Sequence, residues 1–188
     1  MSKRLPTKAE LCLSVESLRD LLTYDSLSGE LLWKHRAQAR TEWNNRYANT
    51  VAGTIVHGEA IQVRITVDGK PKYFRAHRIA WALINGAWPD HIVDHENCDP
   101  SDNRWVNLRA ASISENNTNR SVLAGEVPFK GVYRIRKSGR YGAQIKKNRQ
   151  HTWLGLFDTP EEAARAYDRA AIQLHGEYAK TNSSLGLL

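Results

Sequence analysis

The stretch 92–119 constrains the fold of this chain more than any other part of its sequence. It begins with a β-branched pair, Ile92-Val93, and continues into a loop rich in turn residues at 97–103. Residues 107–110 can return as a second strand, and Ser112-x-x-Glu115 is a capping box that starts a helix. The stretch therefore predicts a strand, a loop, a strand and a helix within about thirty residues.

The sequence before this stretch alternates between helix and strand signals. Thr7-x-x-Glu10 is a capping box that begins a helical pattern, and Asp68-Gly69 is a hairpin turn signal between two alternating runs. Gly86 is a stop signal at the end of a later helix. The expected elements are a helix over 7–24, a strand over 31–33, a hairpin over 61–75 and a helix over 77–85.

The last third of the chain carries three short strand patterns and one helix pattern. The strands are expected at 132–136, 141–145 and 153–155. The helix begins at Thr159-Pro160-Glu161-Glu162, where proline takes the first helical position inside a capping box. Its apolar stripe consists of Ala163, Ala166, Tyr167, Ala170, Ala171 and Leu174. Three strands covered by one amphipathic helix make a small domain.

The predicted fold class is α+β, with two domains. An N-terminal region over 1–120 holds the strand-loop-strand-helix core at about 75–120. A linker over 121–127 precedes a three-stranded antiparallel sheet with one packed helix over 128–182, and a tail covers 183–188.

Charge and cysteine content narrow the function classes. The formal net charge is +7, which favours a polyanionic partner. Between Pro128 and Phe157 the chain lacks Asp and Glu, whereas a solvated face mixes both signs, so nucleic acid is favoured. The cations of this stretch are Lys130, Arg134, Arg136, Lys137, Arg140, Lys146, Lys147 and Arg149. Cys12 and Cys98 have no CxxC partners, which argues against a zinc ribbon.

Compartment signals point to the cytoplasm. No apolar run approaches the roughly 20 residues that span a bilayer, and the first ten residues lack the apolar core of a signal peptide. Two isolated cysteines fit a reducing compartment. We therefore expect no membrane association.

One constellation of polar residues carries the chemistry. It consists of Val93-Asp94-His95-Glu96-Asn97, Asp102-Asn103-Arg104, Asn107-Leu108-Arg109 and Glu115-Asn116-Asn117. At this spacing it strongly resembles the HNH family of ββα-metal nucleases, in the branch found in phage and intron-borne homing endonucleases. The resemblance covers roughly residues 75–120.

The residue types fit phosphodiester hydrolysis. His95 can act as general base, because neutral imidazole accepts a proton near pH 7. Asp94 supplies a carboxylate and Asn116 an amide oxygen, the ligands that one hard divalent cation, Mg²⁺ or Mn²⁺, prefers. The resemblance implies that Asn107 holds His95 in its tautomer and orientation.

Other polar residues of the region receive structural interpretations. Asn103 is expected to be a turn residue of the loop. His77-Arg78 precedes an apolar helix, where a packed or phosphate-contacting role is favoured over catalysis. His91-x-x-x-His95 lacks the glutamate of a zinc protease helix. No catalytic role is expected for His35, His57, His151 and His175.

The last third resembles an AP2 DNA-binding domain over residues 128–182. The resemblance rests on Gly131-Val-Tyr-Arg134, Tyr141-Gly-Ala-Gln-Ile145, Trp153-Leu-Gly155 and Glu161-Glu-Ala-Ala-Arg-Ala-Tyr-Asp168. In that family the sheet lies in the major groove of DNA and the helix packs behind it. The expected DNA-binding residues are Lys130, Arg134, Arg136, Arg140, Lys146, Arg149 and Trp153. A basic RNA- or phosphate-binding module is the alternative.

These observations predict a site-specific, homing-type DNA endonuclease. It would bind double-stranded DNA as a monomer without a protein partner and nick one strand, in a bacterial or phage-infected cell. The family resemblance implies 5′-phosphate and 3′-hydroxyl products and an association with mobile introns or phage genomes. The alternatives are a DNA-binding regulator or splicing-associated factor with a decayed nuclease, and a non-specific degradative nuclease, against which the separate basic domain argues.

Overall fold

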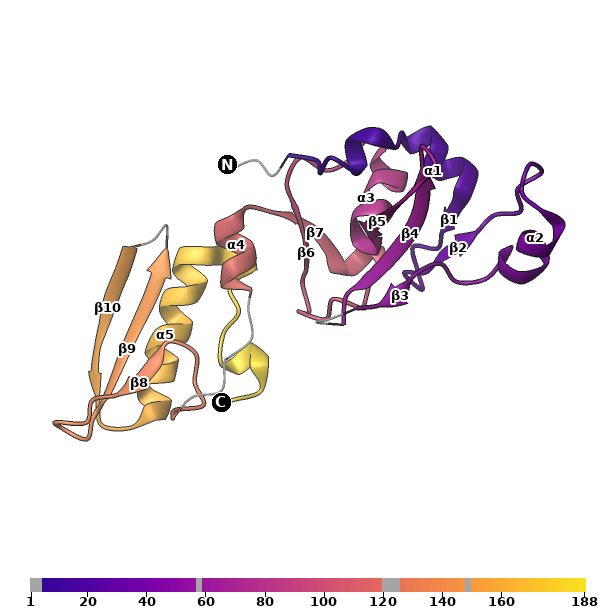
Figure 1. Cartoon of the computed structure of the whole chain (residues 1–188). Helices are drawn as coiled ribbons and strands as arrows, with labels where there is room; N and C mark the ends of the chain where they lie inside the picture. The colour runs from indigo at the N-terminus through magenta and orange to yellow at the C-terminus, as the bar shows by residue number, and fades with distance from the viewer. Residues whose placement is uncertain (1–4, 57–58, 120–125, 148–149) are drawn as a thin grey trace. The chain divides into compact units, whose positions relative to one another are not determined.

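The computed structural model describes residues 5–56, 59–119, 126–147 and 150–188. The chain divides into two compact units, Met1–Ser112 and Ile113–Leu188. The fold is α+β throughout, as predicted (Figure 1). Within the described ranges, no helix is long and apolar enough to cross a membrane.

The first unit contains three small antiparallel sheets, with strand orders β1-β2, β3-β4-β5 and β6-β7. Its elements are α1 (Val15–Leu21), β1 (Leu22–Tyr24), β2 (Leu31–Trp33), α2 (Thr41–Tyr47), β3 (Thr54–Ile55), β4 (Ile61–Val67), β5 (Lys70–Arg75), α3 (Ala76–Asn85), β6 (Ile92–His95) and β7 (Leu108–Ala111).

Most of the predicted elements of this unit are confirmed. The β4–β5 hairpin turns at Asp68 and Gly69, whose φ angles of 52° and 72° suit a tight hairpin turn. Helix α3 ends at Gly86, whose φ of 74° is the left-handed conformation that glycine tolerates. Strand β2 covers the predicted range 31–33.

The single helix expected over 7–24 is wrong. The Thr7–Glu10 capping box does form, but it begins only a 3-10 turn at Glu10–Cys12. Ser14 then caps α1 anew by accepting from Ser17 N–H. The chain leaves the helix at Leu22 because Leu22–Tyr24 pairs with Leu31–Trp33 as a hairpin. Tertiary pairing therefore overrides the helical pattern.

The core of the first unit lies between α1, α3 and the inner face of β4–β5. Leu18, Val63, Phe74 and Ile79 are all almost fully buried there. Strand alternation turns the other face of the hairpin to solvent.

An ion pair is buried beside this core. Arg78 Nε donates to Glu10 Oε1 at 2.6 Å, and Arg78 also donates to the backbone oxygens of His91 and Pro89. Of the two roles considered for Arg78, the packed one is therefore confirmed.

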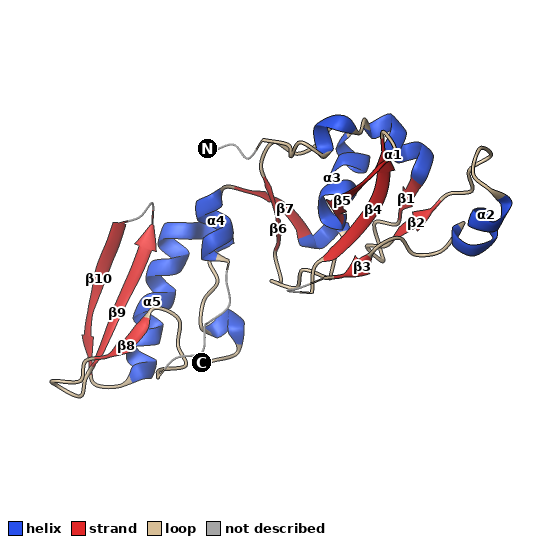
Figure 2. Ribbon diagram, viewed as in Figure 1, coloured by secondary structure: helices blue, strands red, loops and turns tan. Residues whose placement is uncertain are grey.

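The second unit is a three-stranded antiparallel sheet with one covering helix, as predicted (Figure 2). Its elements are α4 (Ile113–Thr118), β8 (Val132–Arg134), β9 (Tyr141–Lys147), β10 (Gln150–Phe157) and α5 (Pro160–His175). The capping box of Thr159 and Glu162 opens α5. Small residues such as Ala163 and Ala164 let the helix lie close to the sheet.

The unit boundary falls after Ser112, so α4 belongs to the second unit, whereas the sequence-based division lies at 120. Most of the predicted linker lies outside the described residues. The predicted tail begins with a 3-10 turn, Ser183–Leu185, which is tied to α5 because Asp168 Oδ2 accepts from Ser183 N–H and Oγ.

Candidate functional site

The β6–β7 pair carries the two central residues of the predicted site. Asp94 lies opposite Arg109 in the strand register, and His95 lies opposite Leu108. Asp94 and His95 are both buried, with exposed fractions of 5% and 9%. Arg109 Nε donates to Asp94 Oδ2 at 3.0 Å, so the buried carboxylate has a cationic partner.

The loop that joins these strands sets the tautomer of His95. Its Nε2 lies 3.0 Å from Asn103 Oδ1. An amide oxygen only accepts hydrogen bonds, so Nε2 carries the proton of the neutral ring and Nδ1 carries the lone pair. The ring of His77, from α3, stands edge-on to His95 with centroids 4.9 Å apart. In this tautomer Nδ1 is the ring nitrogen that can accept a proton.

The hydrogen bonds of Asn103 and Asn107 differ from those expected from the sequence. Asn107 was expected to orient His95, but its Oδ1 accepts from Asn97 N–H at 3.0 Å and its Nδ2 donates to Asp102 O at 2.7 Å. Asn103, expected to be only a turn residue, supplies the amide oxygen at the imidazole. Asn107 therefore stabilises the loop that presents Asn103.

The loop also carries an ion pair. Arg104 Nε and Nη2 donate to the two carboxylate oxygens of Asp102 at 2.8 and 2.6 Å. Chiefly through these bonds, Arg104 lowers the pKa of Asp102 to about 2. The carboxylate remains charged at neutral pH, and it also accepts from the amide of Asn97.

The β1–β2 hairpin supports the same loop from a distant part of the sequence. Tyr24 Oη donates to Asn103 O at 2.7 Å, and burial, with nearby carboxylates, raises the pKa of Tyr24 to about 12. Gly29, with a φ of +80°, lies so close that a Cβ atom there would come within 2.5 Å of Arg104 N. Only glycine fits this position. No local signal in the sequence reveals either contact.

The predicted metal ligands are described in different units. Asp94 lies on β6 in the first unit, and Asn116 lies on α4 in the second. Within the described ranges, no group of three or more His, Cys, Asp or Glu side chains could hold a metal ion.

The outer face of the second unit's sheet is defined by register. Val132, Ala143 and Ile145 are buried on the face toward α5. Their neighbours along each strand point to the opposite face. The outer face therefore carries Tyr133, Gly142, Gln144, Lys146, His151 and Trp153.

Gly142 lets two aromatic rings approach each other across this face. Tyr133 and Trp153 have ring centroids 6.2 Å apart, and they are 38% and 52% exposed. A Cβ atom at residue 142 would lie 2.8 Å from the Trp153 ring and 2.9 Å from that of Tyr133. The result is an aromatic surface flanked by an amide, an ammonium and an imidazole.

Of the predicted DNA-binding residues, Lys146 and Trp153 lie on this outer face. Arg134 pairs in register with Tyr141 on the helix side, contrary to the expectation, and its guanidinium lies 3.9 Å from Glu126. The sequence predicted that Arg134 and Val132 lie on the same face of the sheet. It did not predict which face α5 covers. The sequence interpretation missed Tyr133, Gln144 and His151, which alternation in step with Lys146 and Trp153 could have identified.

Of the other predicted cations, Lys130 and Arg136 lie outside the strands. Lys130 Nζ donates to Thr118 O at 2.5 Å, Arg136 lies in the β8–β9 turn, and Arg149 lies outside the described residues.

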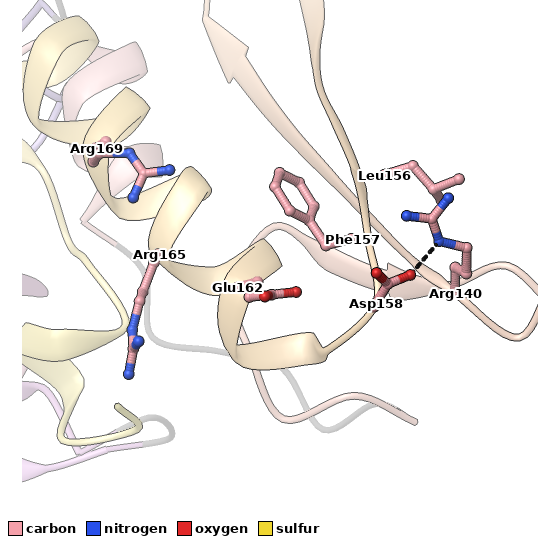
Figure 3. Close-up of a pocket in the computed structure, with 7 residues that line it drawn as sticks. All are labelled: Arg140, Leu156, Phe157, Asp158, Glu162, Arg165 and Arg169. Atoms are coloured by element: carbon pink, nitrogen blue, oxygen red, sulfur yellow. Dashed lines mark ion pairs between the residues drawn. The ribbon is translucent and has the colours of Figure 1, made fainter.

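An open hollow of about 340 Å³ forms beside α5 (Figure 3). Arg140, another of the predicted cations, lies at its edge and pairs with Asp158 at 2.7 Å. Arg165 and Arg169 project from α5, and Glu162 adds a second carboxylate. The hollow is thus lined by three arginines and two carboxylates.

Comparison with known families gives two matches. Residues 74–118 match the family model described as HNH endonuclease, and residues 128–177 match the AP2 domain. Each match covers the part of the chain on which the corresponding site was built. The resemblances to the HNH nucleases and to the AP2 domain that were inferred from the sequence are confirmed.

Curated relatives align with the second unit and its surroundings. The ethylene-responsive transcription factor ERN1 of Medicago truncatula is 44% identical over 82 residues, which are 43% of this chain and 27% of that protein. ERF084 of Arabidopsis thaliana is 57% identical over 56 residues, 29% of this chain and 22% of that protein. ERF069 of Arabidopsis thaliana is 38% identical over 96 residues, which are 48% of this chain and 58% of that protein. The chain thus spans less than two thirds of each.

Among solved structures, one described as "DNA binding and cleavage by the HNH homing endonuclease I-HmuI" is similar over 86% of this chain and 89% of that chain. Its sequence identity is 15% and its TM-score is 0.42.

Proposed function

Starting from a chain that contains an HNH endonuclease segment and an AP2 domain, we propose that this protein is a site-specific DNA endonuclease. The AP2 unit binds a target sequence, and the β6–β7 site hydrolyses one phosphodiester bond. The observation that carries the proposal is His95, buried beside Asp94 and held by Asn103 with its basic nitrogen at Nδ1.

In the proposed reaction His95 Nδ1 accepts a proton from a water molecule. The water oxygen attacks phosphorus, the bond to the 3′ oxygen breaks, and that oxygen takes a proton from solvent. The products are a 5′-phosphate and a 3′-hydroxyl. Asn103 keeps one proton on Nε2, so that before the attack the lone pair lies on Nδ1, and after the attack both ring nitrogens carry a proton.

The donor set suits one hard divalent cation, Mg²⁺ or Mn²⁺. Asp94 and Asn116 offer one carboxylate and one amide oxygen, and neither is a soft ligand. When bound, such a cation supplies positive charge to the phosphate oxygens. Arg109 fixes one oxygen of the Asp94 carboxylate and so limits how the group can turn.

The outer face of the AP2 sheet is the proposed reading surface. A side-chain amide such as Gln144 can pair with the edge of adenine, and Lys146 can contact phosphate. Tyr133 and Trp153 offer exposed ring surface for sugars and thymine methyl groups. Arg136, in the β8–β9 turn, remains a candidate for backbone contact.

The decisive experiment compares His95→Ala with the unchanged chain. Cleavage of duplex DNA in Mg²⁺ or Mn²⁺ should fall by roughly two to four orders of magnitude, while the Kd for DNA stays the same. Strand-resolved mapping of the products then tests the proposed single-strand nick and monomeric, homing-type action. An equal loss of binding would make His95 structural and contradict the mechanism.

A second candidate is a DNA-binding regulator with a decayed nuclease. It is favoured by the transcription-factor relatives of the AP2 unit. The same assay decides between the two, because a regulator would bind a target tightly and leave it intact at every cation concentration.

A further inference from the structure

The first unit carries a projecting lobe between β2 and β3. Residues 34–50, here named the α2 lobe, follow strand β2. The lobe ends before Val51, which forms an isolated β-bridge with Leu32. No residue of α2 is buried, and in Figure 1 this helix stands apart from α1 and α3 of the same unit. The lobe lies outside both family matches, so neither accounts for it.

An aromatic and cationic cluster gives the lobe its shape. The guanidinium carbon of Arg36 lies 3.5 Å from the ring centroid of Trp43, which is the geometry of a close cation–π contact. Trp33 meets Trp43 edge-on at 5.8 Å, and Tyr47 lies 5.3 Å from Trp43. A second arginine, Arg46, lies 5.3 Å from the Tyr47 ring.

Hydrogen bonds fix the backbone that carries the stacked arginine. Asn44, on α2, accepts from Arg36 N–H at 3.0 Å and donates to Arg36 O at 2.8 Å. The two bonds close a loop across eight residues. The cluster is therefore formed in the chain alone and needs little ordering on binding.

The positive charge of the lobe is not neutralised internally. Its cations are Lys34, Arg36, Arg40 and Arg46, and its one carboxylate is Glu42. In the described parts of the chain, no carboxylate forms an ion pair with Arg36, Arg40 or Arg46. Arg40 and Arg46 are exposed, so an external anion can reach their guanidinium groups.

We propose that the α2 lobe is a DNA-binding surface that contacts the phosphate backbone of the duplex without reading its sequence. The inference rests on the proposed function, because that function makes duplex DNA the substrate. Arginine donors in fixed positions suit phosphate oxygens. Arg36 stacks on Trp43 and the three rings pack on one another, so the cluster offers charge rather than an open stacking platform for unpaired bases.

The test is the salt dependence of DNA binding by the full chain. In the double variant Arg40→Gln/Arg46→Gln, two exposed cations are removed and the Trp43 cluster is retained. The slope of log K against log salt should become smaller by about two, since each lost phosphate contact contributes about 0.9. Affinity should fall on the order of tenfold, by the same factor on target and scrambled duplexes.

A second variant, Arg36→Met, keeps apolar contact with Trp43 and removes the stacked charge, which should lower the slope by about one. Arg165→Gln, an exposed change on α5, is the matched control and should leave the slope unchanged. Thermal unfolding of each variant shows whether the fold is kept, and the surface double variant carries the test if Arg36→Met unfolds.

Wild-type slope and affinity in a folded double variant would overturn the α2 lobe proposal and leave the nuclease proposal intact. So would an equal loss in the Arg165→Gln control, or a loss confined to single-stranded DNA. A wild-type chain that neither binds nor cuts any duplex would instead overturn the proposed function.

Discussion

Arg109 on β7 lies directly opposite Asp94 on β6, and its Nε donates to Asp94 Oδ2 at 3.0 Å. The two side chains are 16% and 6% exposed, so the pair is largely shielded from water. A buried carboxylate is costly without a partner. Arg109 therefore supplies the buried Asp94 carboxylate with a cationic partner.

Arg109→Met should lower the free energy of unfolding of the first unit by about 1–3 kcal/mol, because Asp94 loses a charged donor while remaining buried. Urea denaturation measures the change. Asp94→Asn in the same background should recover part of the loss, and a double-mutant cycle gives the coupling. Strictly additive effects of the two substitutions would contradict the pairing.

Asn103→Ala should reduce kcat of DNA cleavage on the order of 10- to 100-fold, since His95 then lacks the group that fixes its proton at Nε2. Single-turnover cleavage and a separate Kd for DNA distinguish this from weaker binding, which should not change. Asn85→Ala, an exposed amide at the end of α3, is the control. A normal kcat in Asn103→Ala would return the orienting role to Asn107.

The buried pair of Glu10 and Arg78 should make stability depend on acid pH. Burial acts to raise the pKa of Glu10, but bonds from Arg78 and Thr7 outweigh it, so the pKa lies below its ordinary range. The stabilisation is therefore complete above the pKa of the unfolded carboxyl and is lost as pH falls through the lowered one.

Glu10→Gln should accordingly lower the free energy of unfolding at pH 7 by about 3–5 kcal/mol, because Arg78 is left as a buried charge. The difference from the unchanged chain should shrink below about pH 4, where the carboxyl becomes neutral. Denaturation at pH 7 and at pH 3 checks both points, with Glu30→Gln, an exposed carboxyl of the same unit, as control. A difference independent of pH would contradict the assignment.

Asn182 should stabilise the second unit far more than its position in the last residues suggests. It is fully buried, accepts from Lys130 N–H at 2.6 Å and donates to Asp168 Oδ1 at 2.9 Å. Asn182→Ala should cost about 1–3 kcal/mol for each buried group left unsatisfied. Calorimetry on the full chain measures the loss, and Gln173→Ala on the exposed side of α5 should show none. Equal melting of the two variants would argue against this role.

Local signals explain which parts of the fold were predictable. The Asp68-Gly69 turn and the Thr159–Glu162 capping box act within a few residues, and both formed as predicted. The 7–24 helix failed because Leu22–Tyr24 finds a partner strand beyond the next turn. The helical pattern of residues 7–24 does not indicate this pairing, because the partner strand lies outside it.

The candidate site divides in the same way. Asp94 and His95 were identified by spacing, because adjacent residues on a short strand keep their register. The choice between Asn103 and Asn107 depends on the path of a loop backbone, which spacing does not define. Arg134 was misplaced for a related reason, since alternation groups residues on a face but does not say which face α5 covers.

The contact between the β1–β2 hairpin and the loop of Asn103 sets a lower limit on the part of the chain that the proposed nuclease needs. Residues 74–118 contain the proposed base, yet Tyr24 and Gly29, which hold the loop in place, lie some fifty residues upstream. If residues 74–118 alone were transferred into another protein, they would include His95 and Asn103. They would lack Tyr24 and Gly29, which support the loop that carries Asn103. A transferable cutting module should therefore begin before Tyr24.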